Sequence, residues 1–230
     1  MKIPNNKIAH RGVFNNTTIP ENSMKAFRKA VELNYPIELD IQLTKDFVLV
    51  VFHDYNLKRM TGIDKNVSDL TYEEIQKLRL LDTKEKIPTL KEVLKLVHNQ
   101  VLLDIEIKST KYVSLICQKF LEEIDGYSNY IVKSFNPKIV RFLKNEHPEL
   151  EVGYLIQKRY PKYIYNILLK SRFMIHYSKA DFLAIDKKLL SSPKFIKLKK
   201  KYPFFIWTVK KEDSYSNKDY VLICNDLCDK

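Results

Sequence analysis

Five side chains in this sequence have the types and spacing that acid–base and metal chemistry need: Glu38, Asp40, Glu106, His10 and His53. Glu38 and Asp40 are separated by one apolar residue, so in an extended strand both carboxylates point to the same side. Two exposed acids on an edge strand would produce the same pattern, and this short motif alone favours neither interpretation. The rest of the chain has to decide between them.

A second acidic strand repeats this alternation. Within the run Leu102–Lys108, Asp104, Glu106 and Lys108 occupy every other position among apolar neighbours. Acids and a base on one face of a central strand are difficult to explain as a solvated surface, because such residues are rarely buried without partners. This strand therefore favours a functional site.

The carboxylates of Glu38, Asp40 and Glu106 are hard oxygen ligands without a soft one beside them, which favours Mg²⁺ or Ca²⁺ over zinc. One such divalent cation could bind a phosphate oxygen. Arg11 and Lys108 could then stabilise the negative charge that develops during phosphoryl transfer.

His10 and His53 have intrinsic pKa values near neutrality, so they could act as general acid and base. The remaining histidines have no comparable neighbours in the sequence. We expect ordinary surface or helix-end positions for these three, His98, His147 and His176.

Short strands have to position these groups. A predicted strand over residues 7–10 places His10 at its end. The strand that contains Glu38 is followed after only five residues by the apolar run 48–52. Such a link is too short for a parallel crossover, so we expect an antiparallel hairpin that returns His53 toward the carboxylates.

Strands and helices alternate along the rest of the chain. With the first two strands they make eight parallel strands, and repeated β-then-α units of this number predict a TIM (β/α)₈ barrel with its site at the carboxyl ends of the strands. We expect two departures from a regular barrel: the helix before the last strand should be short, and no helix should follow that strand. The later strand candidates are Val101–Ile107, Tyr130–Phe135, Glu151–Ile156, Phe182–Ile185, Phe204–Val209 and Val221–Cys224.

Length and composition predict one α/β domain over residues 1–230, with a small insertion at 54–88 that is mostly polar and has too few apolar residues for an independent core. The formal net charge of +12 suits nucleic acid, an anionic membrane surface or an anionic small molecule, and charge alone chooses none of them. No apolar stretch approaches membrane-spanning length and the N-terminal residues lack an apolar signal core. We expect a cytoplasmic protein without stable membrane insertion, of unknown oligomeric state.

Short motifs follow one another along nearly the whole sequence: Ile8-Ala9-His10-Arg11-Gly12, Pro20-Glu21-Asn22-Ser23, Glu38-Leu39-Asp40, Thr44-Lys45-Asp46, Val51-Phe52-His53-Asp54, Glu106-Ile107-Lys108, Lys133-Ser134-Phe135-Asn136 and Trp207-Thr208-Val209. In their order and spacing these motifs resemble the glycerophosphodiester phosphodiesterase family. Phe47 departs from the family pattern by replacing a glycine in the hairpin turn, and Asn225-Asp226 replaces the usual Thr-Asp near the C-terminus.

The resemblance implies a TIM barrel with a small insertion after the first hairpin, and hydrolysis of a small-molecule glycerophosphodiester to glycerol 3-phosphate and an alcohol. Trp207 matches a substrate-wall position, although an aromatic residue in a barrel strand is often simply core. The remaining implied roles are metal ligands for Glu38, Asp40 and Glu106, acid and base for His10 and His53, and phosphate contacts for Arg11 and Lys108.

Two other functions stay open. Phospholipase D-like hydrolysis of lysophospholipids or sphingolipids would predict an apolar, exposed insertion or loop beside the site, whereas residues 56–86 are mostly polar. A non-catalytic basic barrel that binds nucleic acid or another anionic surface would need clustered cations with interleaved aromatics. Only the Lys-Arg-Tyr-Pro-Lys-Tyr run at 158–163 is a faint candidate, and we expect no nucleic-acid partner.

Overall fold

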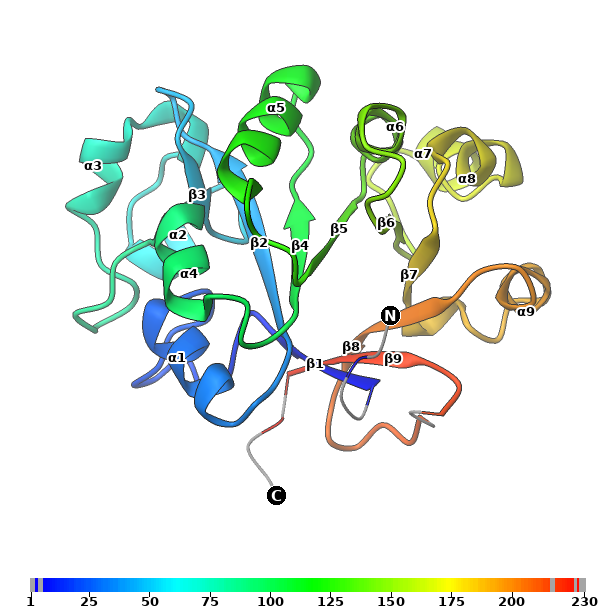
Figure 1. Cartoon of the computed structure of the whole chain (residues 1–230), viewed down its shortest axis with the longest axis horizontal. Coiled ribbons are helices and arrows are strands. Elements are labelled where there is room, and N and C mark those ends of the chain that lie inside the picture. Colours follow the sequence, from blue (N-terminus) through cyan, green and yellow to red (C-terminus); the bar gives the residue numbers. More distant parts are fainter. Residues whose placement is uncertain (1–2, 4–5, 216–217, 226, 228–230) are drawn as a thin grey trace.

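The computed structural model describes residue 3 and residues 6–215, 218–225 and 227. Eight parallel strands form a closed barrel with helices around it, which confirms the predicted TIM barrel (Figure 1). The parallel strands are β1 (Lys7–His10), β2 (Ile37–Leu43), β4 (Leu103–Ile107), β5 (Tyr130–Ser134), β6 (Val152–Ile156), β7 (Phe182–Asp186), β8 (Phe204–Val209) and β9 (Val221–Cys224).

The first strand closes the barrel. β1 pairs in parallel with β2 on one side and with β9 on the other, so the parallel strands have no free edge. His10 is in register with Glu38, and Ala9 with Cys224. The end of β1 therefore lies between the acidic strand and the residue that follows the last strand.

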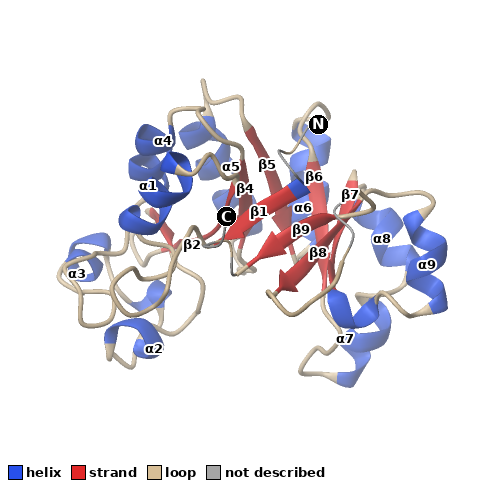
Figure 2. Ribbon diagram, turned by 90° about the horizontal axis from the view of Figure 1, so that it is seen from below, coloured by secondary structure: helices blue, strands red, loops and turns tan. Residues whose placement is uncertain are grey.

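The helices lie outside the strands (Figure 2). A capping box at Thr89 begins α4, because the Thr89 side chain accepts a hydrogen bond from the amide of Glu92 while the Glu92 carboxylate accepts one from the amide of Thr89. Between β8 and β9 the described residues contain no helix. The outer helices are α1 (Met24–Glu32), α4 (Leu90–Val97), α5 (Val113–Ile124), α6 (Pro137–Glu146), α7 (Tyr163–Leu168), α8 (Arg172–Ser178) and α9 (Pro193–Lys199), with a short 3₁₀ turn at Lys187–Leu189.

The predicted hairpin is present. β3 (Leu49–Val51) runs antiparallel to β2, with Ile41 opposite Val51. The segment that follows contains α2 (Lys58–Thr61), a 3₁₀ turn (Val67–Asp69) and α3 (Tyr72–Gln76). The sequence analysis found too few apolar residues in this segment for an independent core. The structure shows that widely spaced apolar residues of the segment instead form a buried cluster together with two residues of the hairpin, Val50 and Phe52. The segment's own members of this cluster are Leu57, Met60, Val67, Leu70, Ile75, Leu80 and Ile87.

Side-chain alternation divides each barrel strand between two environments. Leu39 and Ile105 face the helices and belong to the large outer core, whereas Ile8 belongs to a smaller cluster inside the barrel. The members of this inner cluster are Ile3, Ile8, Leu102, Ile131, Leu155, Phe182, Ala184, Phe205 and Ile223. His10 follows Ile8 by two residues and therefore lies on the same face of β1. The barrel interior is thus apolar toward the amino ends of the strands and polar toward their carboxyl ends.

Candidate active site

Three buried carboxylates meet inside the barrel. Glu38 and Asp40 come from β2 and Glu106 from β4, and one oxygen of each lies within 4.8 Å of the others. The strand register explains the meeting, because Asp40 is directly opposite Glu106. The two acidic runs of the sequence therefore form one cluster.

Two buried lysines compensate the negative charge of this cluster. The Nζ atom of Lys108 lies 2.8 Å from Oδ1 of Asp40 and 2.7 Å from Oε1 of Glu106. The Nζ atom of Lys133, on β5, lies 2.5 Å from Oδ2 of Asp104 and 3.2 Å from Oε1 of Glu38. Sequence analysis missed this role of Lys133, whose partners lie on other strands.

Burial and charge shift the pKa values of these acids in opposite directions. Burial raises the pKa of Glu106, and repulsion from Asp40 and Glu38 adds to this, against the attraction of Lys108. Burial also raises the pKa of Asp104. For Asp40 burial is outweighed by Lys108, His53 and Arg11, which hold the pKa of its carboxyl well below the ordinary value. The cluster thus combines a strongly ionised carboxylate with acids that bind protons more readily.

Asn22 and Arg11 hold the first loop against the same cluster. The side-chain amide of Asn22 donates to Oδ2 of Asp40 over 2.9 Å, and the backbone amide of Arg11 donates to Oε2 of Glu38 over 3.1 Å. Both residues have positive φ, 52° for Asn22 and 57° for Arg11. An asparagine tolerates this left-handed backbone better than most residues, which gives its position in the family-like motif a physical reason.

The donor set fits a divalent cation. All three carboxylates are buried, and hard oxygen ligands of this kind suit Mg²⁺ or Ca²⁺. The Oδ1 atom of Asn22 is buried beside them without a hydrogen-bond partner among the described residues. A cation or its bound water would satisfy such an orphaned acceptor.

The two histidines approach the cluster from different elements, His10 from the end of β1 and His53 from the loop after β3. His10 places Nε2 3.9 Å from Oε2 of Glu38, while its Nδ1 lies 2.5 Å from Oδ1 of Asn225. Burial lowers the pKa of both His10 and His53. Asn225 is a contact that sequence analysis missed, and Asp226 lies outside the described residues.

His53 is held by a chain of charged residues. Its Nδ1 atom lies 2.6 Å from Oδ1 of Asp54, and Nε of Arg59 donates to the other oxygen of Asp54 over 2.6 Å. Arg59 and Arg11 both contact Oε1 of Glu21 at 2.6 Å.

Gln42 supports the backbone around His53. Its side-chain amide donates to the carbonyl oxygens of the two residues on either side of His53, those of Phe52 and Asp54.

A cavity of about 330 Å³ connects these groups. His10, His53, Glu38 and Glu106 line it together, and Trp207 contributes to its opposite wall. The Trp207 ring packs edge-on against Phe135 with centroids 5.6 Å apart. The structure thus brings Trp207 to the cavity wall, where its ring also packs against the inner core.

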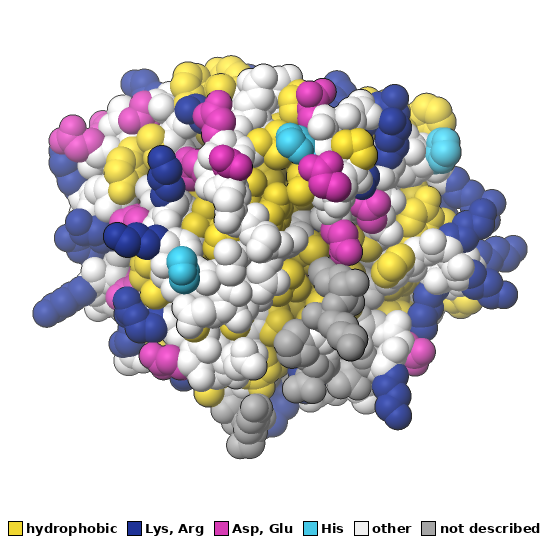
Figure 3. All heavy atoms as spheres, in the orientation of Figure 1, with side chains coloured by type: hydrophobic (Ala, Val, Ile, Leu, Met, Phe, Trp, Pro, Cys, Tyr) yellow, Lys and Arg dark blue, Asp and Glu magenta, His cyan; other side chains and the backbone are white. Residues whose placement is uncertain are grey.

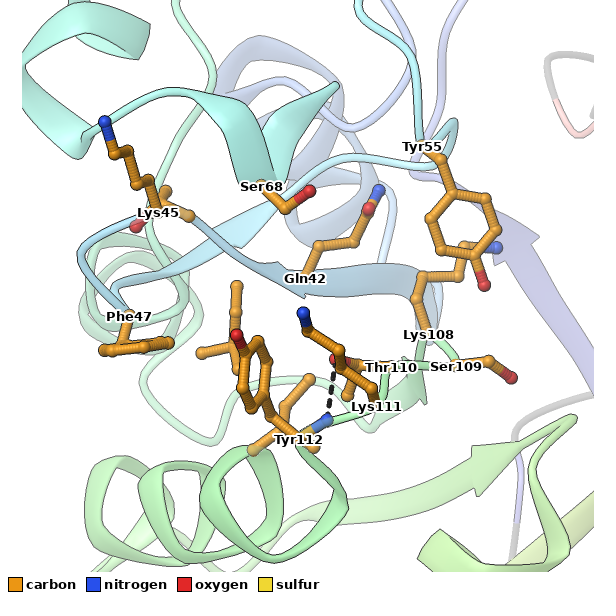
Figure 4. Close-up of a pocket in the computed structure, with 13 residues that line it drawn as sticks. Gln42, Lys45, Phe47, Tyr55, Ser68, Lys108, Ser109, Thr110, Lys111 and Tyr112 are labelled. Carbon is orange, nitrogen blue, oxygen red and sulfur yellow. Dashed lines mark hydrogen bonds between the residues drawn. The ribbon is translucent and has the colours of Figure 1, made fainter.

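A second cavity of about 450 Å³ adjoins the cluster on the hairpin side. Tyr55 and Lys108 lie together at one end of it and Phe47 at the other, with Lys111 and Tyr112 between them (Figure 4). Lys108 contacts the acidic cluster through Nζ and also lines this cavity. A molecule bound at the cluster therefore has room to extend past Lys108.

Several known proteins resemble this chain in sequence. The model of the glycerophosphoryl diester phosphodiesterase family matches residues 10–226. A glycerophosphodiester phosphodiesterase of Caldanaerobacter subterraneus is 42% identical over 163 residues, which cover 65% of this chain and 66% of that protein. A putative glycerophosphodiester phosphodiesterase of Bacillus subtilis, YhdW, is 32% identical over 88% of this chain and 85% of that protein.

A solved structure shares the fold. The Oleispira antarctica phosphodiesterase in complex with its product sn-glycerol-3-phosphate superposes with a TM-score of 0.79 and 20% identity, covering 95% of this chain and 92% of that one. Within the described residues, no helix is both long and apolar enough to cross a membrane.

Proposed function

The chain belongs to the glycerophosphoryl diester phosphodiesterase family, a family of phosphoric diester hydrolases, and from this premise we propose that it hydrolyses glycerophosphodiesters to glycerol 3-phosphate and an alcohol. The observation that carries the proposal is the cluster of three buried carboxylates, two of which, Glu38 and Glu106, line one cavity together with both histidines. The product named for the O. antarctica protein, which has the same fold, is the product proposed here.

Glu38, Asp40 and Glu106 would hold one divalent cation, Mg²⁺ or Ca²⁺. When bound, it would supply positive charge that polarises the phosphoryl group. Arg11 and Lys108 add fixed positive charge from the protein itself, because both side chains are held against the carboxylates. These cations stabilise the oxygens on which negative charge builds up during the reaction.

His10 and His53 serve as general acid and base. Burial lowers the pKa of each, so either ring can be neutral near pH 7 and accept a proton from the nucleophile. The other ring returns a proton to the departing alcohol. Water and the 2-hydroxyl of the substrate's own glycerol both fit as the nucleophile, and a cyclic phosphate intermediate would identify the second.

The test is replacement of each histidine by alanine, with glycerol 3-phosphate release from glycerophosphocholine as the measurement. We expect each variant, His10→Ala and His53→Ala, to lose about 10²-fold or more in kcat. His147→Ala is the matched control, since His147 lies on the surface beside Glu149. Near-wild-type rates in both site variants would refute the mechanism.

Lysophospholipids are a second candidate substrate class, because this activity predicts an exposed apolar segment beside the site and α7 is exposed and apolar. It lies after β6 and not in the polar insertion, where sequence analysis had sought it. Comparing turnover of glycerophosphocholine with that of lysophosphatidylcholine tests this alternative. Faster turnover of the lysolipid would favour it.

A further inference from the structure

Helix α7 has none of the burial that ordinarily holds an outer helix on a barrel. It contains no buried residue, and its apolar side chains face solvent. Tyr163 is 80% exposed, Ile164 59% and Ile167 56%, and Phe173 at the start of α8 is 69% exposed. We call this cluster the α7–α8 surface; its residues are Tyr163, Ile164, Tyr165, Ile167, Leu168 and Phe173.

Positive charge surrounds this surface. Residues 157–180 contain six lysines and arginines and no aspartate or glutamate. Among the described residues, the ion pairs on either side of this stretch are Lys144 with Asp181 and Lys187 with Asp213, and neither Lys162 nor Arg172 takes part in them. Burial lowers the pKa of Lys194, and repulsion from Arg172 and Lys170 lowers it further, so these cations lie near one another. Asp186, at the end of β7, is an acid that interacts with Lys170. Figure 3 shows Lys and Arg crowding the edge where α8 and α9 lie.

The surface begins at the mouth of the barrel. Gln157, which directly follows β6, lines the cavity of the candidate active site. The backbone amide of the next residue, Lys158, donates to Oδ2 of Asp186 at the end of β7 over 3.1 Å. Figure 2 shows α7 projecting on the side toward which the β8 arrowhead points, the side on which α2 also lies. The exposed apolar residues and the cavity therefore share one end of the molecule.

This chemistry fits one kind of partner best. Exposed aliphatic side chains such as Ile164 and Ile167 have no stacking partner in a nucleic acid, which binds through aromatic rings and cations. A bilayer interface accepts aliphatic and aromatic side chains alike, and anionic headgroups attract the surrounding cations. An acidic protein would match the charge but would need a complementary apolar groove.

We propose that the α7–α8 surface docks the protein reversibly on a bilayer with anionic headgroups, with the barrel mouth toward the lipid. The apolar side chains of α7 and Phe173 enter the interface, and the cations of residues 158–172 contact the headgroups. Docking of this kind is peripheral and needs no spanning helix. It holds whichever diester the active site prefers.

The test is sedimentation of the full chain with phosphatidylcholine vesicles that contain or lack phosphatidylserine. We expect binding only with phosphatidylserine, and a drop of about tenfold in partitioning for Ile164→Ser/Ile167→Ser. For Lys162→Glu/Arg172→Glu we expect the partitioning onto vesicles with phosphatidylserine to drop by at least about fivefold for each cation removed. Leu33→Ser, directly after α1, and Arg28→Glu/Lys95→Glu, on α1 and α4, are matched controls far from the α7–α8 surface, and they should bind as the wild type does.

Hydrolysis of soluble glycerophosphocholine should be unchanged in all of these variants, which shows that each is folded. The proposal is overturned if the wild-type chain binds both vesicle types equally or neither, or if the control variants lose binding as much as the α7–α8 variants. A change in oligomeric state on substitution of Ile164 and Ile167, without vesicle binding, would instead identify the surface as a contact between copies of the chain.

Discussion

Nδ1 of His10 and Oδ1 of Asn225 lie 2.5 Å apart although their positions in the chain differ by 215. With the amide oxygen as acceptor, Nδ1 carries the proton and Nε2 is left unprotonated toward Glu38. The backbone amide of Asn225 donates to the carbonyl of Val209 over 3.1 Å, which fixes this acceptor in place. Asn225 thus orients the ring and selects its tautomer.

Removing that acceptor should slow turnover more than it weakens substrate binding. For Asn225→Leu we expect kcat to fall about 10-fold to 100-fold with little change in KM, since the ring loses its orientation while the phosphate contacts remain. Asn225→Asp keeps an acceptor oxygen and should retain most of the activity. Equal kcat values for the Leu and Asp variants would contradict this role.

Neutralising one acid of the cluster should weaken cation binding. For Glu106→Gln we expect a loss of about 100-fold or more in the affinity for Mn²⁺ or Ca²⁺, measured by titration calorimetry, because one of three anionic ligands is removed. A chelator should abolish activity in the wild type, and added Mg²⁺ or Ca²⁺ should restore it. Asp64→Asn, an exposed acid outside the cluster, is the control and should bind the ion normally.

Lys133 should matter for stability because both of its carboxylate partners, Asp104 and Glu38, are buried. It is 1% exposed and contacts both Asp104 and Glu38. Lys133→Met leaves buried carboxylates without compensation and should lower the free energy of unfolding by about 3–5 kcal/mol in urea denaturation. Adding Asp104→Leu to this variant should recover part of the loss; a double variant less stable than Lys133→Met would argue against the pairing.

The ionisation of Glu21 should make the free energy of unfolding depend on pH in the acid range. Burial would raise its pKa, but hydrogen bonds from Arg59 and Asn16 and the charge of Arg11 lower the pKa from 4.5 to about 2. Because its pKa is lowered in the folded protein, the ionised Glu21 carboxylate contributes about 3 kcal/mol to the free energy of unfolding. This contribution is fully present above pH 4.5 and is lost as the pH falls toward 2.

The comparison of wild type with Glu21→Gln measures this effect. The difference in their free energies of unfolding should be largest at pH 7 and shrink by about 3 kcal/mol as the pH is lowered through this window. Glu73→Gln is a suitable control, because Glu73 is exposed in its pair with Lys77 and should show little change. A pH-independent difference for Glu21→Gln would contradict the assignment.

Much of the molecule follows from local sequence patterns. The alternation in β2 and β4 placed Leu39 and Ile105 outward and the acids inward, and the five-residue link made the hairpin antiparallel. These features were predictable because period-2 alternation and loop length act within a few residues. The repeated β-then-α units predicted the barrel for the same reason.

Contacts between distant segments were decided only by the tertiary structure. Lys133 with Asp104, His10 with Asn225 and Glu21 with Arg59 are pairs whose members come from separate strands or loops. Barrel closure brings them together, and no local periodicity encodes such a pairing. The exposure of α7 also depends on which neighbours pack against it. The sequence by itself therefore determined which faces carry charge, whereas the closed barrel decided which charges meet, because burial and distance arise only when separate strands share one interior.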